Sequence, residues 1–230
     1  MRVLMGTSGF SYSAWKGSFY PAKLPAKDML RFYAERFPAV EVNNTFYRLP
    51  KQEVLEGWTR EVPADFAFAV KASQRLTHIL RLKDAGETLA FFLSQLSGLG
   101  DHLGPVLYQL PPNMKKDLGR LVPFLAMLAR GGRSAFEFRH ASWFDDEVYA
   151  ALREHGVALC VADDEKLSTP RVATAGFGYL RLRRPDYPPE GLADWLSFVK
   201  GNAWTDAFVF FKHEDEARGP AYAVQLQGMI

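Results

Sequence analysis

Residues 134–139 read SAFEFR and residues 39–43 read AVEVN, two short runs in which apolar and polar side chains alternate. Alternation with a period of two is typical of a β-strand, whose successive side chains point to opposite faces. Six further runs of similar length recur along the chain, and stretches with helical periodicity separate most of them. The predicted strands cover residues 3–7, 39–43, 66–71, 105–109, 134–139, 157–162, 178–183 and 207–212.

The repeated order of strand and helix predicts parallel strands joined by crossover helices. Dividing the 230 residues among eight strands gives about 29 residues per unit, which suits a closed (β/α)8 TIM-type barrel. An open, doubly wound sheet is the alternative. No linker or low-complexity tract divides the sequence, so we expect residues 1–230 to form a single barrel domain. Residues 163–177 contain Pro170 and are too few for a full crossover helix, so we expect that helix to be missing or reduced to a turn.

The composition is that of a globular protein and excludes several other classes. The 28 Lys and Arg residues oppose 26 Asp and Glu residues, so the net charge of +2 is too small for a strongly basic nucleic-acid scaffold. Cys160 is the single cysteine, which excludes an intrachain disulfide and a cysteine-cluster metal site. The N-terminus lacks a signal-peptide apolar region, and no stretch reaches the roughly 18 apolar residues of a membrane span. We therefore expect a cytoplasmic protein without membrane contact.

Polar side chains gather at the predicted carboxyl ends of the strands, whereas the amino-terminal halves are apolar. The period of two places Glu41 with Asn43 on one strand face, and Glu137 with Arg139 on another. Such charges inside a barrel cost several kcal/mol each unless they are paired, hydrated or bound to a charged ligand. We interpret the set as a ligand or catalytic site; a salt-bridge network that plugs the barrel is the alternative. The other members of the set are Lys71, Gln109, Asp163, Arg181 and His213.

Ordered motifs from residue 6 to the C-terminus resemble the YecE-like family, also called DUF72. They are GTSGFSY (6–12), WKG (15–17), FYP (19–21), EVNNTFY (41–47), KAS (71–73), QLPP (109–112), EFRH (137–140), SWF (142–144) and KHEDEA (212–217). The resemblance implies a TIM barrel, in agreement with the strand count, and supplies no reaction. Where similar sequences of the family close the seventh strand with Arg-Leu-His-Gly, this chain has RLRR at 181–184, so either a histidine there is not essential in this chain or a cation replaces it.

The residue types indicate binding of a small anionic molecule, sugar-like or nucleotide-like, that carries phosphate or carboxylate. Two carboxyls in unequal surroundings acquire different proton affinities, so Glu41 and Glu137 are the candidate general acid and base. Lys71 is expected to hold an anionic group, and a Schiff-base role for its amine is the alternative. His213 is a candidate proton shuttle. The predicted substrate-binding residues are Asn43, Gln109, Arg139, Asp163, Arg181, Ser8, Tyr12, Trp15 and Trp143.

Two functions of different classes fit these residues. One is an enzyme, a hydrolase, lyase or isomerase that uses Glu41 and Glu137. The other is a non-catalytic nucleic-acid or nucleotide binding module, in which loop cations hold the backbone and aromatic rings stack on bases. Acidic neighbours such as Asp163 and Asp164 oppose a nucleic-acid backbone and favour the first. The loop cations of the second are Arg75, Arg81, Lys83, Lys115, Lys116, Arg183 and Arg184.

No cofactor is predicted. A divalent metal receives little support, because the sequence has no His-x-His or His-Glu-x-x-His spacing and several cations would repel the ion. The candidate ligands for such a metal are Glu41, Glu137, Asp163 and His213. The sequence leaves the oligomeric state open.

Overall fold

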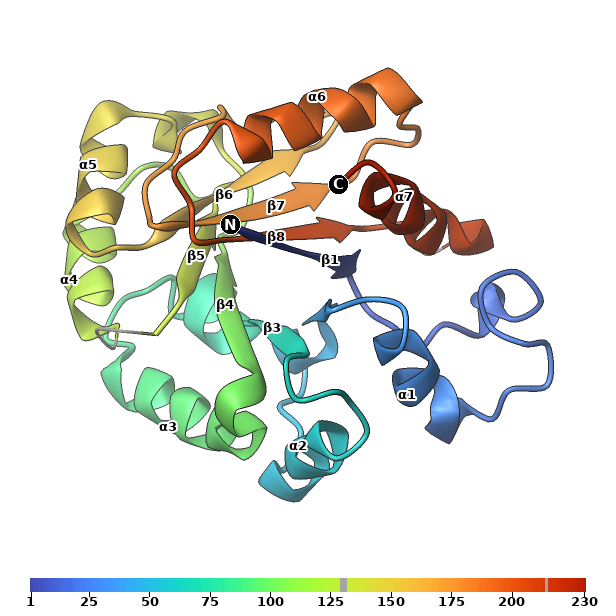
Figure 1. Cartoon of the computed structure of the whole chain (residues 1–230). Coiled ribbons are helices and arrows are strands. Elements are labelled where there is room, and N and C mark those ends of the chain that lie inside the picture. Colours follow the sequence, from blue (N-terminus) through green and yellow to red (C-terminus); the bar gives the residue numbers. More distant parts are fainter. Residues whose placement is uncertain (129–131, 214) are drawn as a thin grey trace.

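The structure is a computed structural model that describes residues 1–128, 132–213 and 215–230. Within those residues, eight parallel strands form a nearly closed barrel with helices around it (Figure 1). All eight predicted strands are confirmed, and their ends lie within two residues of the predicted ones. The strands are β1 (Arg2–Thr7), β2 (Ala39–Val42), β3 (Ala67–Lys71), β4 (Leu103–Gln109), β5 (Ser134–Glu137), β6 (Ala158–Asp163), β7 (Phe177–Leu182) and β8 (Asp206–Phe211).

The helices cover the outer face of the barrel (Figure 1). No helix occurs in residues 164–176, all of which the structure describes, so the missing crossover between β6 and β7 is confirmed. Pro170 in this segment lacks the backbone N–H that a helix interior needs. The α-helices in the described residues are α1 (Met29–Ala34), α2 (Gln52–Thr59), α3 (Gly86–Leu96), α4 (Leu118–Met127), α5 (Asp146–Glu154), α6 (Pro189–Lys200) and α7 (Arg218–Gln227).

The barrel closes differently on the two sides of β1. On one side β1 pairs with β8 along its whole length. On the other side the contact with β2 is a bridge between Ser8 and Glu41, where the Gly9 N–H donates to the Glu41 carbonyl oxygen at 2.8 Å. This bridge lies at the carboxyl end of the strands, so the closure is tightest at the end where Glu41 lies.

A tyrosine from α1 fills the rest of the gap between β1 and β2. The Tyr33 hydroxyl accepts a hydrogen bond from the Thr7 N–H at 2.7 Å and donates to the Ala39 carbonyl oxygen at 3.1 Å. Gly6 permits this close approach, because a Cβ there would lie 2.0 Å from the Ala39 oxygen. The hydroxyl thus takes the place of the missing ladder hydrogen bonds, which buried backbone groups require.

Two apolar layers hold the barrel together. Inside it, small residues such as Ala69 and Ala135 pack with large ones such as Phe208 and Tyr179. Between strands and helices a second, larger cluster contains Val40, Phe136 and most helix-facing side chains. The inner layer stops short of the carboxyl ends of the strands, and polar side chains fill the barrel from there outward.

Candidate functional site

The predicted inward faces of β2, β3, β4, β5 and β7 are confirmed. On β2, for example, Ala39 belongs to the cluster inside the barrel, and Glu41 follows two positions later on the same face. The other four strands repeat this pattern of an inward apolar residue followed by an inward polar one. The inward polar residues are Glu41 on β2, Lys71 on β3, Gln109 on β4, Glu137 on β5 and Arg181 on β7.

Three of these side chains form a sealed ion-pair cluster, the buried triad of Glu41, Glu137 and Arg181. Arg181 Nη2 donates to Glu41 Oε1 at 2.7 Å, and Arg181 Nη1 donates to Glu137 Oε2 at 2.5 Å. Both glutamates are fully buried, and Arg181 is 1% exposed. One guanidinium therefore joins carboxylates from two different strands inside the barrel.

Neutral side chains add further hydrogen bonds to the triad, although Arg181 Nε and Glu137 Oε1 have no hydrogen-bond partner within the described residues. Glu41 Oε1 accepts from Ser8 Oγ at 2.7 Å and from Asn43 Nδ2 at 3.0 Å, and Glu41 Oε2 accepts from the Tyr179 hydroxyl at 2.7 Å. Gln109 Oε1 accepts from the guanidinium at 3.1 Å. Three predicted substrate-binding residues, Ser8, Asn43 and Gln109, thus hydrogen-bond to the triad.

The surroundings keep both triad carboxylates ionised. Burial by itself would raise the pKa of Glu41, but the charge of Arg181 and the hydrogen bonds from Ser8 and Tyr179 outweigh it and lower that pKa. Burial and the Arg181 charge oppose each other in the same way at Glu137, whose pKa is also lowered. A general acid needs a proton near neutral pH, and a general base needs an oxygen within reach of the substrate. The predicted acid–base roles of Glu41 and Glu137 find no support in this geometry.

A second layer of cations lies one step nearer the open end of the barrel. It contains Lys71, Arg139, Arg183 and Lys212, and we call it the mouth ring. Arg139 and Arg183 follow Glu137 and Arg181 by two residues, and Lys212 follows the inward-facing Phe210 by two. All four cations are partly exposed, in contrast to the triad below them.

The two arginines of the mouth ring share their carboxylate partners. Arg139 Nη1 is 3.1 Å from Asp164 Oδ2, and its Nε contacts Glu137 Oε1. Arg183 Nη1 is 3.2 Å from the same Asp164 oxygen and 3.8 Å from Glu137 Oε1. The triad and these contacts together contain three carboxylates and three guanidiniums, so their six charges cancel. The six residues are Glu41, Glu137, Asp164, Arg139, Arg181 and Arg183.

The two lysines of the mouth ring add positive charge that no ion pair with a described carboxylate balances. Neither Lys71 nor Lys212 forms an ion pair within residues 1–128, 132–213 and 215–230. Lys71 Nζ lies 4.3 Å from the centre of the Phe46 ring. Burial lowers the pKa of Lys71 to about 8, and the positive charges of Arg181 and Lys212 act in the same direction, against Glu137 and Glu41. Near neutral pH the Lys71 amine is still mainly protonated, so its positive charge faces the mouth.

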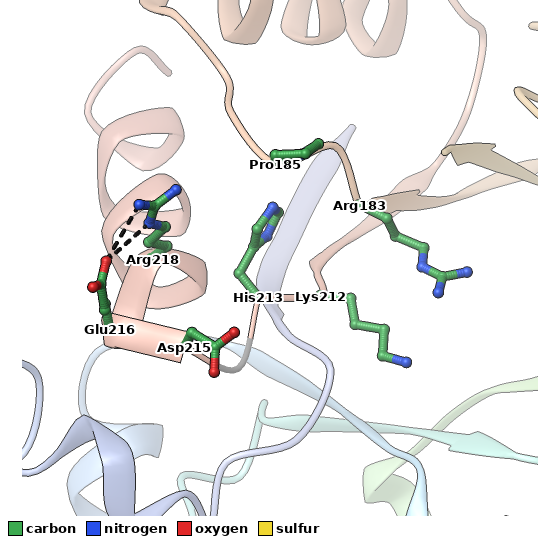
Figure 2. Close-up of a pocket in the computed structure, with 7 residues that line it drawn as sticks. All are labelled: Arg183, Pro185, Lys212, His213, Asp215, Glu216 and Arg218. Atoms are coloured by element: carbon green, nitrogen blue, oxygen red, sulfur yellow. Dashed lines mark hydrogen bonds and ion pairs between the residues drawn. The ribbon is translucent and has the colours of Figure 1, made fainter. Parts of the chain in front are cut away.

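A cavity of about 680 Å³ opens beside the mouth ring, over the ends of β7 and β8. Figure 2 shows the Arg183 and Lys212 side chains extending to the same side, away from the Glu216–Arg218 ion pair. This volume lies in the range of small-molecule sites. The lining residues are Arg183, Pro185, Lys212, His213, Asp215, Glu216 and Arg218.

A smaller cavity of about 200 Å³ lies over the ends of β1 and β2. Tyr12 and Asn43, both predicted to bind substrate, line it together with Trp58. The Tyr12 hydroxyl donates to the Ser8 carbonyl oxygen at 2.8 Å, which fixes the ring beside the opening. This cavity is lined mainly by aromatic and amide groups, without a cation among its described lining residues.

Trp15 and Trp143, both predicted to bind substrate, are fully buried, and nothing in the packing supports that role. Trp15 packs against Tyr12 with ring centres 4.7 Å apart. Trp143 stacks on Phe138 at 4.7 Å and 11°, and its Nε1 donates to the Met114 carbonyl oxygen at 2.7 Å. These rings form apolar cores under the loops at the carboxyl ends of the strands.

Asp163, predicted to bind substrate, faces away from the barrel interior. Cys160 of β6 lies inside the barrel and Val161 outside it, so Asp163 points outward with Val161. Its carboxylate accepts from Arg184 Nε at 2.6 Å and from the Tyr187 hydroxyl at 3.0 Å. These bonds hold the loop after β7, and the substrate-binding role of Asp163 stays a prediction.

His213 lies in the wall of the larger cavity. Its Nε2 hydrogen-bonds to the Arg184 carbonyl oxygen, and burial lowers the pKa of the ring. A neutral ring that donates from Nε2 to a carbonyl has its Nδ1 unprotonated, and that atom is buried without a hydrogen-bond partner among the described residues. The predicted proton-transfer role of His213 therefore stays a prediction.

Two residues of the site are absent from the predicted set. Lys212 lies within the KHEDEA motif, and its spacing from Phe208 and Phe210, which indicates an inward-facing side chain, is the signal that could have identified it. Asp164, expected only to oppose a nucleic-acid backbone, pairs with both Arg139 and Arg183.

Within the described residues, no group of three or more His, Cys, Asp or Glu side chains is arranged to hold a metal ion. Nor is any helix in that part of the chain long and apolar enough to span a membrane.

Comparison with known proteins gives a family but no activity. Residues 4–230 match the family model described as "Protein of unknown function DUF72". The chain is 30% identical over 214 residues to UPF0759 protein YunF of Bacillus subtilis, covering 86% of this chain and 75% of that protein. It is 27% identical over 165 residues to UPF0759 protein YecE of Escherichia coli K12, covering 69% of this chain and 61% of YecE. The chain therefore spans less than two thirds of the length of YecE.

A solved structure of a DUF72 family protein from Thermotoga maritima covers this chain throughout. Its TM-score is 0.85 at 30% sequence identity, with 100% of this chain and 99% of that chain aligned. The barrel and the residues at its mouth therefore sit in a fold that recurs among relatives of this sequence.

Proposed function

This chain belongs to the DUF72 family of proteins of unknown function, and we propose that it binds a small dianionic molecule at the mouth ring. The ligand class is a phosphate monoester or a dicarboxylate, sugar-like or nucleotide-like in size. The observation that carries the proposal is the pair of lysines, Lys71 and Lys212, that face the mouth without a counter-ion in the described residues. Catalysis by the buried glutamates is not part of the proposal.

Electrostatics supports a doubly charged ligand. The three carboxylates and three guanidiniums of the site cancel, so the lysines leave two positive charges over. The charge of Lys212 contributes to the lowered pKa of Lys71, as expected when two like charges lie near each other. An anion placed between like charges replaces this repulsion with attraction, and partial burial strengthens the effect.

The two arginines of the mouth ring have a chemistry that suits the same ligand. Arg139 and Arg183 contact Glu137 and Asp164, yet their side chains keep 19% and 18% of their surface exposed. Guanidinium groups match the geometry of phosphate and carboxylate oxygens. The exposed parts of these side chains would therefore add to the attraction of an anion at the mouth.

Nucleic acid is a weaker candidate, because acidic groups already hold several of the cations named for it. Lys116 Nζ lies 2.7 Å from Asp145 and 2.5 Å from Glu147. Arg184 is paired with Asp163. These pairs reduce the local positive field that a phosphate backbone needs.

The test is titration calorimetry with a sugar phosphate, with a dicarboxylate, and with the uncharged sugar as reference. We expect the dianions to bind the wild type and the free sugar not to bind. Lys212→Met should weaken dianion binding by at least about tenfold, because a charged hydrogen bond is lost. Lys200→Met, at the exposed end of α6, is the matched control and should leave affinity unchanged.

Two outcomes would contradict the proposal. One is a calorimetric titration at low ionic strength in which no dianion gives a measurable heat of binding. The other is equal weakening by Lys212→Met and Lys200→Met, since that would mean a diffuse surface charge instead of a built site. Tight, salt-sensitive binding of single-stranded oligonucleotides with no binding of small dianions would favour the nucleic-acid module.

A further inference from the structure

We propose that Lys71 is a nucleophilic amine that forms an imine with the carbonyl group of the bound anion. The inference rests on the proposed function, since the anionic group of the ligand is held by Lys212 and Arg183 while its carbonyl carbon reaches Lys71. The substrate class is therefore a small aldehyde or ketone that also carries phosphate or carboxylate.

The position of Lys71 suits such a reaction. It is the last residue of β3 and faces the barrel mouth, where (β/α)8 proteins place their reactive groups. Its Nζ lies 4.3 Å from the centre of the Phe46 ring and makes no hydrogen bond or ion pair in the part of the chain that the structure describes. An amine without an acceptor partner keeps its lone pair available once it loses a proton.

Burial and nearby positive charges favour the neutral amine of Lys71, whereas the face of the Phe46 ring attracts its protonated form. The His78 ring packs against Phe46 with centres 4.8 Å apart and helps to enclose the site. Burial and the charges of Arg181 and Lys212 lower the pKa of Lys71 to about 8, while Glu137 and Glu41 oppose the shift. At about pH 7.5 roughly a quarter of such amines are neutral, against about 0.1% of an ordinary lysine.

Other groups in the site are less suited to covalent chemistry. Glu41 and Glu137 are fully buried carboxylates whose pKa values the Arg181 charge lowers, and Cys160 is a buried thiol whose pKa burial raises. A buried thiol with a raised pKa is a poor nucleophile. Lys71 is the inward-facing group in the described structure that combines access, a free amine and a nearby anion site.

The bond changes balance without a further reactant. The neutral Lys71 nitrogen attacks the carbonyl carbon and forms a C–N bond, giving a carbinolamine. Loss of one water, which takes the former carbonyl oxygen and the two amine hydrogens, leaves the C=N double bond. No electron is transferred, so no oxidant or reductant is required. The imine nitrogen then takes up one proton from solvent, and the resulting iminium withdraws electrons from the adjacent carbon, which is the basis of imine catalysis.

The test uses pyridoxal 5′-phosphate, a small aldehyde that carries a phosphate, on the full chain. After borohydride reduction, peptide mass spectrometry locates the phosphopyridoxyl label. We expect Lys71 to be labelled at least about ten times faster than the exposed Lys200, because a far larger fraction of its amine is neutral. A phosphate monoester without a carbonyl should slow labelling of Lys71, and pyridoxal without phosphate should label it more slowly.

Two variants separate the imine from simple anion binding. Lys71→Arg keeps the positive charge and should keep most of the affinity for a sugar phosphate. It should nevertheless lose the rapid phosphopyridoxyl labelling, because a guanidinium does not form the imine. Lys71→Met should lose the phosphopyridoxyl label and should also bind the sugar phosphate more weakly, because it removes the positive charge. Circular dichroism and the melting temperature report whether each variant is folded.

The outcomes distinguish the two proposals. If sugar phosphates bind the wild type but Lys71 is labelled no faster than Lys200, the imine inference fails and the anion site stands. If dianions do not bind at all, the proposed function fails first. Fast labelling of Lys71 that a phosphate monoester does not slow would also overturn the inference, because the amine would then react outside the anion site.

Discussion

The buried triad and the mouth ring differ by only two residues along the strands. Glu137 lies in the triad and Arg139 in the ring, and Arg181 and Arg183 repeat the step. Two residues advance a strand by about 6.6 Å on the same face. The charged groups of the triad are fully buried and paired, whereas those of the mouth ring, one step along the strands, are partly exposed. The ring also contains the two lysines that form no ion pair within the described residues.

The comparison teaches that charge inside the barrel serves two purposes. In the triad each ion is desolvated, so its partners are needed for the fold to be stable. In the ring the lysines keep contact with solvent and form no ion pair with any residue that the structure describes, so their charges are available to a ligand. Mutations in the triad should therefore change stability, and mutations of the ring lysines should change binding.

The largest expected effect breaks the triad. Arg181→Met leaves two carboxylates buried without their counter-ion, and we expect it to lower the free energy of unfolding by about 3–5 kcal/mol. Urea denaturation measures the change. Arg31→Met is the matched control, because Arg31 pairs with Glu61 at the surface, and its effect should be at most about 1 kcal/mol. Similar small losses in both variants would mean that the triad is not a stability element.

A smaller effect distinguishes buried aromatic residues from ligand-stacking ones. Trp143→Phe keeps the stacking on Phe138 but leaves the buried Met114 carbonyl without its donor. We expect a loss of about 1–3 kcal/mol in unfolding free energy, with dianion affinity unchanged in calorimetry. A large drop in affinity at unchanged stability would instead place Trp143 in the ligand site.

The smallest effect concerns the pH dependence of stability at Lys71. Its folded-state pKa of about 8 lies below the ordinary value of 10.5, so the unfolded chain binds more protons between these values and stability rises with pH there. Between about pH 7.5 and 8.5 the wild type should gain on the order of 0.5–1 kcal/mol relative to Lys71→Met. Urea midpoints of both proteins at each pH measure the difference. A pH-independent difference would mean that the Lys71 amine is not perturbed.

Much of the barrel could be predicted from sequence, because the signals for its strands lie within short segments of the chain. Alternation in runs such as AVEVN and SAFEFR fixed both the strand and its polar face, because Glu41 and Glu137 stand between apolar outward residues. The absence of a helix after β6 was equally readable, since Pro170 and the short segment left no room for one.

The sequence pattern did not determine which way some side chains point or whether they are buried. In β6 both faces are apolar, as is usual for parallel strands, so the period of two could not tell Asp163 from an inward residue. Aromatic residues such as Trp15 and Trp143 suit a core and a ligand platform equally well, and only packing decides between them.

The pairing of charges could not be predicted either. It depends on which strands face one another across the barrel, and this is a property of the closed fold. Sequence grouped Lys71 and Arg139 as anion ligands, but the structure gives Arg139 two carboxylates and leaves Lys71 without one in the described residues. Only the structure therefore distinguishes the unpaired lysines from the paired arginines of the mouth ring.

A crystal structure of the protein grown near neutral pH with a saturating phosphate monoester tests the separation of the two layers most directly. The account predicts the phosphate within hydrogen-bond reach of Lys212 Nζ and of Lys71 Nζ or Arg183, with Glu41, Glu137 and Arg181 unmoved beneath it. A phosphate bound elsewhere, or one that displaces Arg181 from its glutamates while both lysines stay in solvent, would contradict it.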